Sequence, residues 1–151
     1  MYKVFLFLLM LPALSQAASL TGNVFKSPTC GCCNAWIEHM QDNGFVLQGV
    51  NADDLNQVKQ TFGIPPKAQS CHSAKIDDFV FEGHVPADIV KTFLANPPAN
   101  ALGLSVPGMP IGSPGMEMGD RVDNYTVQLL MQDGSMRPYA EINRASVHFH
   151  D

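Results

Sequence analysis

The chain has 151 residues, of which 46% are hydrophobic and 15% charged, and this length suits one domain of ordinary size. Nine Lys and Arg against fourteen Asp and Glu give a formal net charge of −5. Because the phosphate backbone is bound by clustered cations, this acidic balance argues against nucleic acid as a partner. Four cysteines, five histidines and eight methionines are unusual for the length and direct attention to metal and redox chemistry.

Residues 1–17 have the pattern of a secretory signal peptide. Lys3 precedes an apolar stretch from Val4 to Leu14, and Ser15-Gln16-Ala17 supplies the small residues that a signal peptidase recognises. About eleven apolar residues are too few for the ~20 that span a bilayer, and no later stretch is long enough. We therefore expect cleavage near Ala17, a mature chain of one domain (residues 18–151) without a membrane span, and a periplasmic location if the source is bacterial.

Strand and helix patterns alternate in the first half of the mature chain. Two short strands are predicted at residues 21–25 and 45–50, and a helix between them ends at Asn43-Gly44. A second helix runs from about Ala52 to Gly63, with Asn51 or Asp53 as its N-cap. The first helix has one buried face, formed by residues at i, i+3, i+4 and i+7: Cys33, Trp36, Ile37 and Met40.

The second half predicts two hairpins, separated by a helix and a loop. Strands at 71–76 and 79–83 form the first hairpin, and strands at 125–131 and 136–142 form the second around Asp133-Gly134. Residues 101–119 contain five Gly, three Pro and three Met and are predicted to be neither helix nor strand. The helix between hairpin and loop begins at Pro86, and its apolar face consists of Ile89, Val90, Phe93 and Leu94.

This order, β-α-β-α-β-β-α, predicts an α/β thioredoxin-like core with an added Gly/Pro/Met-rich loop and a C-terminal β-hairpin. If the third strand runs antiparallel to the first, its start at Cys71 lies beside the end of the first strand, where the other cysteines stand. The fourth strand returns to the same edge and leads to His84. We therefore expect one site to contain this histidine and all four cysteines: Cys30, Cys32, Cys33 and Cys71.

The cysteines at the start of the helix lend themselves to three kinds of chemistry. Free backbone N–H groups and the positive end of the helix dipole favour thiolates there. The alternatives are two structural disulfides, a thiol–disulfide oxidoreductase that uses Cys30 and Cys33, and a sulfur-rich metal site. Cys32 favours the metal site, because a simple dithiol has no use for a third sulfur, whereas clustered thiolates can bridge several soft ions. Zinc sites with four Cys usually draw on two separated C-x₂-C pairs, which this chain lacks.

Methionine favours Cu(I) over zinc, because thioethers are soft and neutral ligands. Met109, Met116 and Met118 lie on the Gly/Pro loop and are candidate additional ligands, with flexible filling of an apolar patch as the alternative. His84 is a further candidate ligand, because the predicted strand order places it at the same edge of the sheet as the cysteines.

The other histidines have weaker claims. His72 should face away from Cys71 if that segment is a strand, because side chains alternate there. His39 lies outside the apolar face of its helix and is expected to be exposed. His148 and His150 lie on an extended tail that we expect to be solvated.

Five blocks in register resemble a bacterial family catalogued as a domain of unknown function. The blocks are residues 25–33 (FKSPTCGCC), 70–73 (SCHS), 82–86 (EGHVP), 106–110 (VPGMP) and 112–117 (GSPGME), and the likeness covers about residues 22–140. The family includes the CopG-type periplasmic copper-resistance proteins, which are described as thioredoxin-like and as holding a multinuclear copper cluster through cysteine sulfurs. The resemblance implies that the four cysteines are cluster ligands; Ser73, where Thr is more usual, is a mild departure.

The resemblance implies a periplasmic copper-resistance protein that holds several Cu(I) ions and meets other periplasmic copper-handling proteins. Copper would be stored, passed on or changed in oxidation state. Among these roles, metal binding and sequestration are favoured over a copper oxidoreductase activity. The alternative from a different class is a thiol–disulfide oxidoreductase of thioredoxin-like type.

Overall fold

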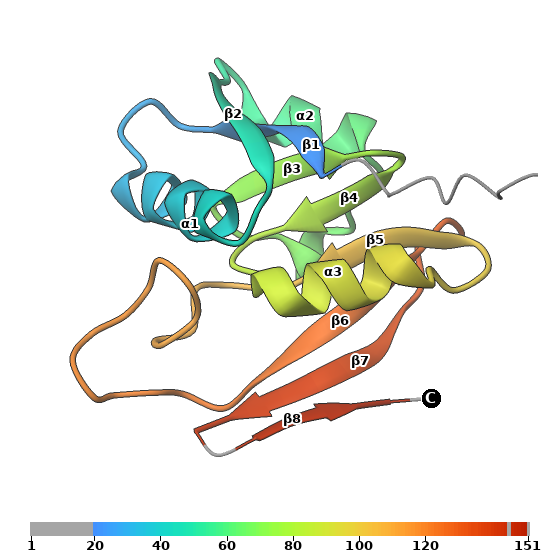
Figure 1. The fold of residues 1–151 in the computed structure, drawn as a ribbon. Helices are drawn as coiled ribbons and strands as arrows, with labels where there is room; N and C mark the ends of the chain where they lie inside the picture. Colours follow the sequence, from blue (N-terminus) through green and yellow to red (C-terminus); the bar gives the residue numbers. More distant parts are fainter. Residues whose placement is uncertain (1–19, 145, 151) are drawn as a thin grey trace, which may run out of the picture.

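The computed structural model describes residues 20–144 and 146–150, and the predicted signal peptide lies outside them. Figure 1 shows a mixed α/β fold in which strands and short helices alternate along the first part of the chain. In chain order the elements are β1 (Thr21–Lys26), α1 (Gly31–Asp42), β2 (Val46–Asn51), α2 (Leu55–Thr61), the 3-10 helix η1 (Pro66–Ala68), β3 (His72–Ile76), β4 (Phe79–Glu82), α3 (Ala87–Ala95), β5 (Ala101–Ser105), β6 (Tyr125–Met131), β7 (Met136–Asn143) and β8 (Ser146–Phe149). The α/β class is confirmed, and so is the predicted order of elements from β1 to α3. Among the described residues, no helix is long and apolar enough to cross a membrane.

All strands belong to one eight-stranded sheet with the order β2-β1-β3-β4-β5-β6-β7-β8. β1 pairs with β2 in parallel and β4 with β5 in parallel, and every other neighbouring pair is antiparallel. The predicted C-terminal hairpin is β6–β7, and the tail that follows it adds the exposed edge strand β8. β1 and β3 pair in antiparallel fashion, which is the condition on which the predicted convergence of the cysteines depended.

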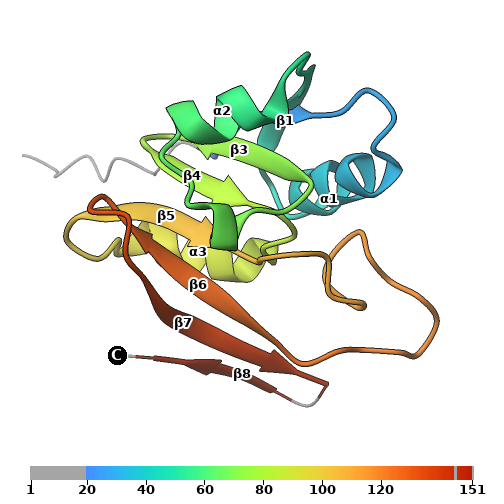
Figure 2. The same cartoon turned by 180° about the vertical axis from the view of Figure 1, so that it is seen from behind.

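The helices divide between the two faces of the sheet. α1 and α3 cover one face, and α2 with η1 covers the other, as the two opposite views show (Figures 1 and 2). The main hydrophobic core lies under α1 and α3, and Trp36, Phe81 and Phe93 are its largest fully buried side chains. A smaller cluster under α2 and η1 contains Ile64, Ala68, Val80 and Leu130.

The ends of the helices follow local chemistry. α1 buries the four predicted residues, Cys33, Trp36, Ile37 and Met40, and ends at Asn43 before Gly44, whose φ of +89° suits a glycine. The predicted N-cap of α2 was wrong. Asp54, and neither Asn51 nor Asp53, accepts hydrogen bonds from two N–H groups of the first turn, because β2 extends through Asn51 and delays the helix.

The largest correction concerns residues 101–119, which were predicted to contain no strand. Residues 101–105 form β5, a central strand between β4 and β6. Gly103 is required there for close backbone approach, since a Cβ at this position would lie 1.7 Å from the carbonyl oxygen of Val80. The glycine that suggested a loop therefore marks a tight strand contact beside a bulge.

Candidate metal centre

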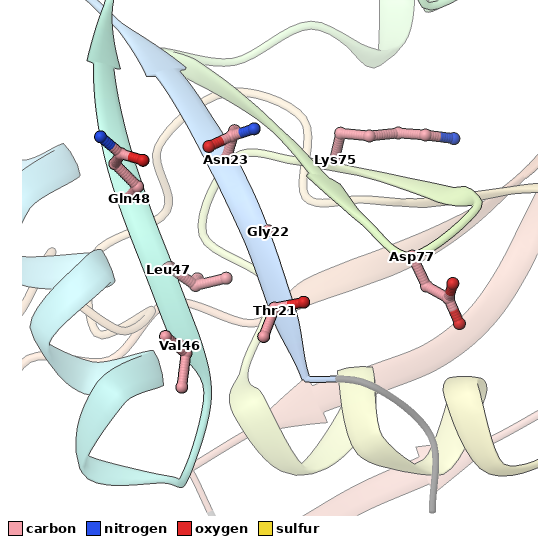
Figure 3. A pocket seen from close by; sticks show the side chains of 8 residues that line it. All are labelled: Thr21, Gly22, Asn23, Val46, Leu47, Gln48, Lys75 and Asp77. Carbon is pink, nitrogen blue, oxygen red and sulfur yellow. The ribbon is translucent and has the colours of Figure 1, made fainter. Parts of the chain in front are cut away.

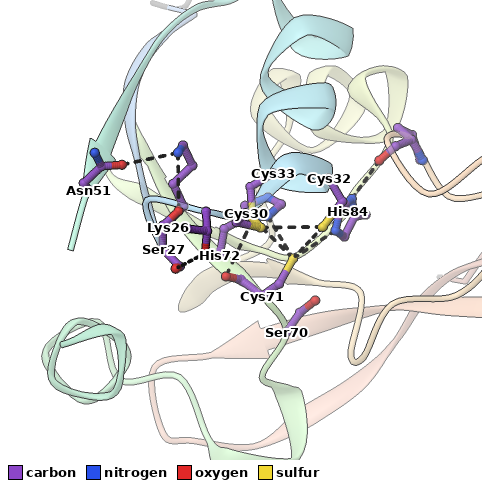
Figure 4. Close-up of a disulfide and its surroundings, with 12 residues drawn as sticks. Lys26, Ser27, Cys30, Cys32, Cys33, Asn51, Ser70, Cys71, His72 and His84 are labelled. Atoms are coloured by element: carbon purple, nitrogen blue, oxygen red, sulfur yellow. Dashed lines mark hydrogen bonds between the residues drawn. A yellow bond between two sulfur atoms is a disulfide. The ribbon is translucent and has the colours of Figure 1, made fainter. Parts of the chain in front are cut away.

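Three chain segments meet at one edge of the sheet and bring the four cysteines together (Figure 4). Cys30 is the N-cap of α1, and Cys32 and Cys33 lie in its first turn. Cys71 immediately precedes β3, whose first residue pairs with the last residue of β1. The β3–β4 hairpin then returns the chain to the same edge at His84. The predicted convergence is therefore present in the structure.

The sulfur atoms are spaced as in a thiolate metal site. The Sγ–Sγ distances are 3.5 Å for Cys30 and Cys32, 3.6 Å for Cys33 and Cys71, and 4.0 Å for Cys32 and Cys71. A tetrahedral ion with metal–sulfur bonds of ~2.3 Å separates its sulfur ligands by about 3.8 Å. Ligand atoms of all four cysteines lie within 4.8 Å of one another. The cluster could therefore bind a metal without a change of fold.

Cys30 and Cys33 form a disulfide, and Cys32 and Cys71 are free. The interpretation as two structural disulfides is not what the structure shows, because the described cysteines form one bond and leave two thiols. A disulfide across a C-x-x-C at a helix start is the oxidised state of a redox dithiol. Reduction by two electrons is needed before all four sulfurs can act as thiolate ligands.

Burial controls the protonation of Cys71. Desolvation, followed by the effect of the neighbouring Cys32 sulfur, raises the pKa of its thiol to about 12. A cation is therefore needed to hold this sulfur as a thiolate at neutral pH, and binding releases its proton.

His84 is oriented by the Gly/Pro/Met-rich loop. Its Nδ1–H donates to the carbonyl oxygen of Pro114 at 2.7 Å, and since a carbonyl only accepts, the proton sits on Nδ1. Burial lowers the pKa of His84, so Nε2 carries a lone pair, and this atom lies 3.0 Å from Cys71 Sγ. A metal-binding histidine is typically fixed by such a bond from its other ring nitrogen.

His72 also belongs to this site, against the expectation that it would face away from Cys71. Its Nδ1 lies 3.4 Å from Cys71 Sγ, and its ring packs 4.5 Å from Trp36 and 5.0 Å from His84. The alternation rule failed because β3 begins at His72, so Cys71 is outside the strand.

The loop that carries Pro114 packs directly on the start of α1. Gly115 has a φ of +85°, and a Cβ there would lie 2.8 Å from both the Cys32 carbonyl oxygen and the Trp36 nitrogen. The loop methionines are more exposed: Met109 is 52% and Met118 62% exposed, and Met116 is partly buried. Their role as ligands stays a prediction.

A buried charge network supports Cys71 from the face of the sheet that α2 covers. Lys59 forms an ion pair with Glu82, and both are almost completely inaccessible to solvent. Glu82 also accepts hydrogen bonds from the Ser73 hydroxyl and, at 2.6 Å, from the backbone N–H of Ser70, next to Cys71. This network was not predicted, because no local sequence pattern shows that a lysine of α2 meets a glutamate of β4.

His39 is partly buried, and the expectation that it would be exposed was wrong. Its Nε2 accepts a hydrogen bond of 3.2 Å from the N–H of Ala87, the first residue of α3. Burial lowers the pKa of His39, which keeps the ring neutral and able to accept. It links α1 to α3 away from the cysteines.

A surface pocket is hollowed at the opposite end of β1 from the cysteines (Figure 3). Its lining contains neither cysteine nor histidine and consists of Thr21, Gly22, Asn23, Val46, Leu47, Gln48, Lys75 and Asp77. The metal-ligating chemistry of the chain is therefore separate from this hollow.

Comparisons with known proteins agree with this geometry. Two solved structures of copper resistance protein CopG, Form 2 and Form 1, are 41% and 42% identical to the chain, each with a TM-score of 0.77. Each alignment covers 82% of this chain and 98% of the CopG chain. A family model described as "Protein of unknown function, DUF411" matches residues 68–116, which include Cys71 and His84. A search of curated proteins found no significant match.

Proposed function

Since the chain belongs to the family of the CopG copper resistance proteins, we propose that it is a periplasmic protein that binds copper as Cu(I) for copper resistance. In this proposal residues 1–17 are removed after export and residues 18–151 form a single metal-binding domain. The cluster ligands are Cys30, Cys32, Cys33 and Cys71. The observation that supports this most directly is the approach of four sulfurs from two distant segments to within 4.8 Å.

The ligand set favours Cu(I) over zinc. The cluster offers four sulfur atoms and no carboxylate, and soft thiolates select soft ions. Three of the sulfurs come from four consecutive residues, which makes it difficult for all of them to surround one tetrahedral ion. Bridging sulfurs shared between several Cu(I) ions satisfy the same ligands with less distortion. Sequestration of copper, with transfer to other periplasmic copper-handling proteins, is the function that such a site would serve.

The Cys30–Cys33 disulfide supports a second candidate, a thiol–disulfide oxidoreductase. The two candidates differ in their need for Cys32. A dithiol enzyme needs Cys30 and Cys33 alone, whereas the copper cluster uses Cys32 as a bridge to Cys71. Disulfide closure removes two ligands, so the cluster and the disulfide are alternative states of the same residues.

An anaerobic titration of the reduced protein with Cu(I), followed by desalting and metal analysis, tests the proposal. We expect more than one Cu(I) per chain and preference over Zn²⁺, with stoichiometry or affinity lowered sharply by Cys→Ser at each of the four positions. Asn34→Ser, an exposed change in the first turn of α1, is the matched control and should bind normally. If Cys32→Ser left copper binding intact, the oxidoreductase would become the better account.

A further inference from the structure

We propose that Glu141, His148 and His150 form a separate metal site on the β7–β8 ribbon, which takes a divalent first-row transition ion and binds Cu(II) most tightly. The site goes beyond the proposed function, because it uses none of the four cysteines and neither of the buried histidines beside them. β8 is five strands away from β3 in the sheet order, which is roughly 24 Å at about 4.8 Å per strand. The ribbon and the cysteine cluster therefore cannot share an ion (Figure 1).

The two histidines are exposed, as expected, but the tail that carries them is paired with β7. β8 pairs with β7 over four residues, and the N–H of His150 extends this ladder by donating to the Tyr139 carbonyl oxygen at 2.8 Å. At the turn between the strands, the Asn143 side chain accepts a hydrogen bond of 2.9 Å from the N–H of Ser146. The Phe149 ring lies 5.8 Å from that of Tyr139, which packs against the main core. These contacts fix the backbone from which the imidazoles project.

Register and alternation place the three side chains on one face of the sheet. Phe149 pairs with Ala140, which is buried in the main core. Because side chains alternate along a strand, His148 and His150 point to the opposite face. Glu141 pairs directly with His148, and the Cβ atoms of such a pair are about 4.5–5.5 Å apart on the same face. In Figure 2, which shows this face, no helix crosses β7 or β8, so an ion can reach the exposed side chains from solvent.

One pair of ligand atoms already has the spacing that a bound ion requires. Glu141 Oε1 lies 3.4 Å from His150 Nε2. A tetrahedral ion with metal–nitrogen and metal–oxygen bonds of about 2.05 and 2.1 Å separates two such ligands by about 3.4 Å. The ring of His148 is not within 4.8 Å of both other ligand atoms, so it completes the site by rotating toward them. Exposed side chains change rotamer within picoseconds to nanoseconds, and this rotation therefore presents no barrier to binding.

The ligand set favours a transition ion of intermediate softness. Imidazole suits copper, zinc, iron and nickel, and one carboxylate adds a negative charge that stabilises a divalent ion. Cu(I) is bound better by sulfur, and Mg²⁺ and Ca²⁺ are bound better by sets of oxygen ligands. At a site of nitrogen and oxygen ligands, the affinity for Cu²⁺ exceeds those for Ni²⁺ and Zn²⁺. Three protein ligands also leave a position open for water.

A titration with Cu(II) in a chain without free thiols tests the proposal independently of the sulfur cluster. The background is Cys32→Ser/Cys71→Ser with the Cys30–Cys33 disulfide closed, so that no free thiol reduces the ion. We expect one Cu(II) per chain, bound through two imidazoles. Pulsed electron paramagnetic resonance on ¹⁵N-histidine-labelled protein counts the coupled nitrogens. Coupling to no imidazole, or to one, would overturn the proposal.

Variants in this background assign the two nitrogens and the carboxylate. His148→Ala/His150→Ala should lose the two-nitrogen signal and weaken Cu(II) binding at least tenfold. Retention of that signal would place the ion at the buried histidines and overturn the proposal. Glu141→Gln should weaken binding about tenfold, whereas Glu38→Gln, the same change at an exposed position of α1, should bind normally. Equal affinities of the two glutamine variants would exclude the carboxylate as a ligand and overturn the three-residue site.

A register swap distinguishes a site built on the strand from two histidines that happen to lie near each other in the sequence. Val147→His/His148→Val keeps the composition and moves one imidazole to the face that holds Phe149. Val147 is 48% exposed, so the exchange leaves the core unchanged, and circular dichroism verifies folding. We expect binding at least tenfold weaker, with one coupled nitrogen. Unchanged affinity with two coupled nitrogens would overturn the proposal, and tighter binding of Ni²⁺ or Zn²⁺ than of Cu²⁺ to the unswapped chain would overturn the choice of metal.

Discussion

Replacing Glu82 by glutamine removes the counter-ion of a lysine that has almost no contact with water. The side chain of Lys59 is 5% exposed and that of Glu82 is fully buried, so the variant leaves an ammonium group without a charged partner. Breaking a buried pair in this way costs about 3–5 kcal/mol of unfolding free energy. With an unfolding entropy of about 2.1 cal/mol/K per residue over about 130 folded residues, the melting temperature should fall by roughly 11–18 °C.

Thermal unfolding of the metal-free protein, followed by far-ultraviolet circular dichroism, measures this shift. Glu38→Gln makes the same chemical change at an exposed position of α1 and should alter stability by less than about 0.5 kcal/mol. Adding Lys59→Met to Glu82→Gln removes the stranded charge and should recover a large part of the loss. A fall below about 3 °C for Glu82→Gln alone would refute the argument that this pair anchors the segment before Cys71, because it corresponds to less than about 1 kcal/mol.

Three further predictions concern other parts of the chain. Gly115→Ala should destabilise the protein by about 1–3 kcal/mol more than Gly134→Ala in urea unfolding, because both have positive φ but only the first Cβ meets the backbone of α1; equal losses would contradict the packing of the loop. His39 has a lowered pKa when folded, so its contribution to stability is present above the unfolded value of about 6.5 and is lost as pH falls below it; His39→Gln, which keeps an acceptor for Ala87, should reduce the loss between pH 7.5 and 5.5, and an unchanged slope would argue against this role. Intact mass of the protein from an osmotic-shock fraction should correspond to a chain that begins at or near Ala18, and a full-length mass in the cytoplasm would contradict export.

The site was largely predictable where local pattern and strand direction decide it. The i, i+3, i+4, i+7 spacing placed Cys33 and Trp36 on the buried face of α1, and the structure confirms this. The expected antiparallel pairing of β1 and β3 was sufficient to bring Cys71 to the start of α1. The first inference depends on the period of the α-helix, and the second depends on the direction of neighbouring strands. Both can be deduced from the order and spacing of residues in the sequence.

The remaining features depend on contacts between distant segments. Gly103 suggested a loop, because the sequence does not show that the backbone of Val80 approaches it. The position of His72 was missed because β3 begins one residue later than predicted, so Cys71 lies outside the strand and both side chains reach the site. The ion pair of Lys59 and Glu82 joins α2 to β4, and a charged residue by itself is more often solvated than paired and buried.

The central claim is that cysteine sulfurs from both segments hold Cu(I) together. X-ray absorption at the copper edge of the reduced, Cu(I)-loaded protein tests it most directly, with Cys71→Ser for comparison. The account predicts a first shell dominated by sulfur, scattering between neighbouring copper ions, and loss of copper from the Cys71→Ser variant. A first shell dominated by nitrogen or oxygen, or an unchanged copper content in Cys71→Ser, would contradict it.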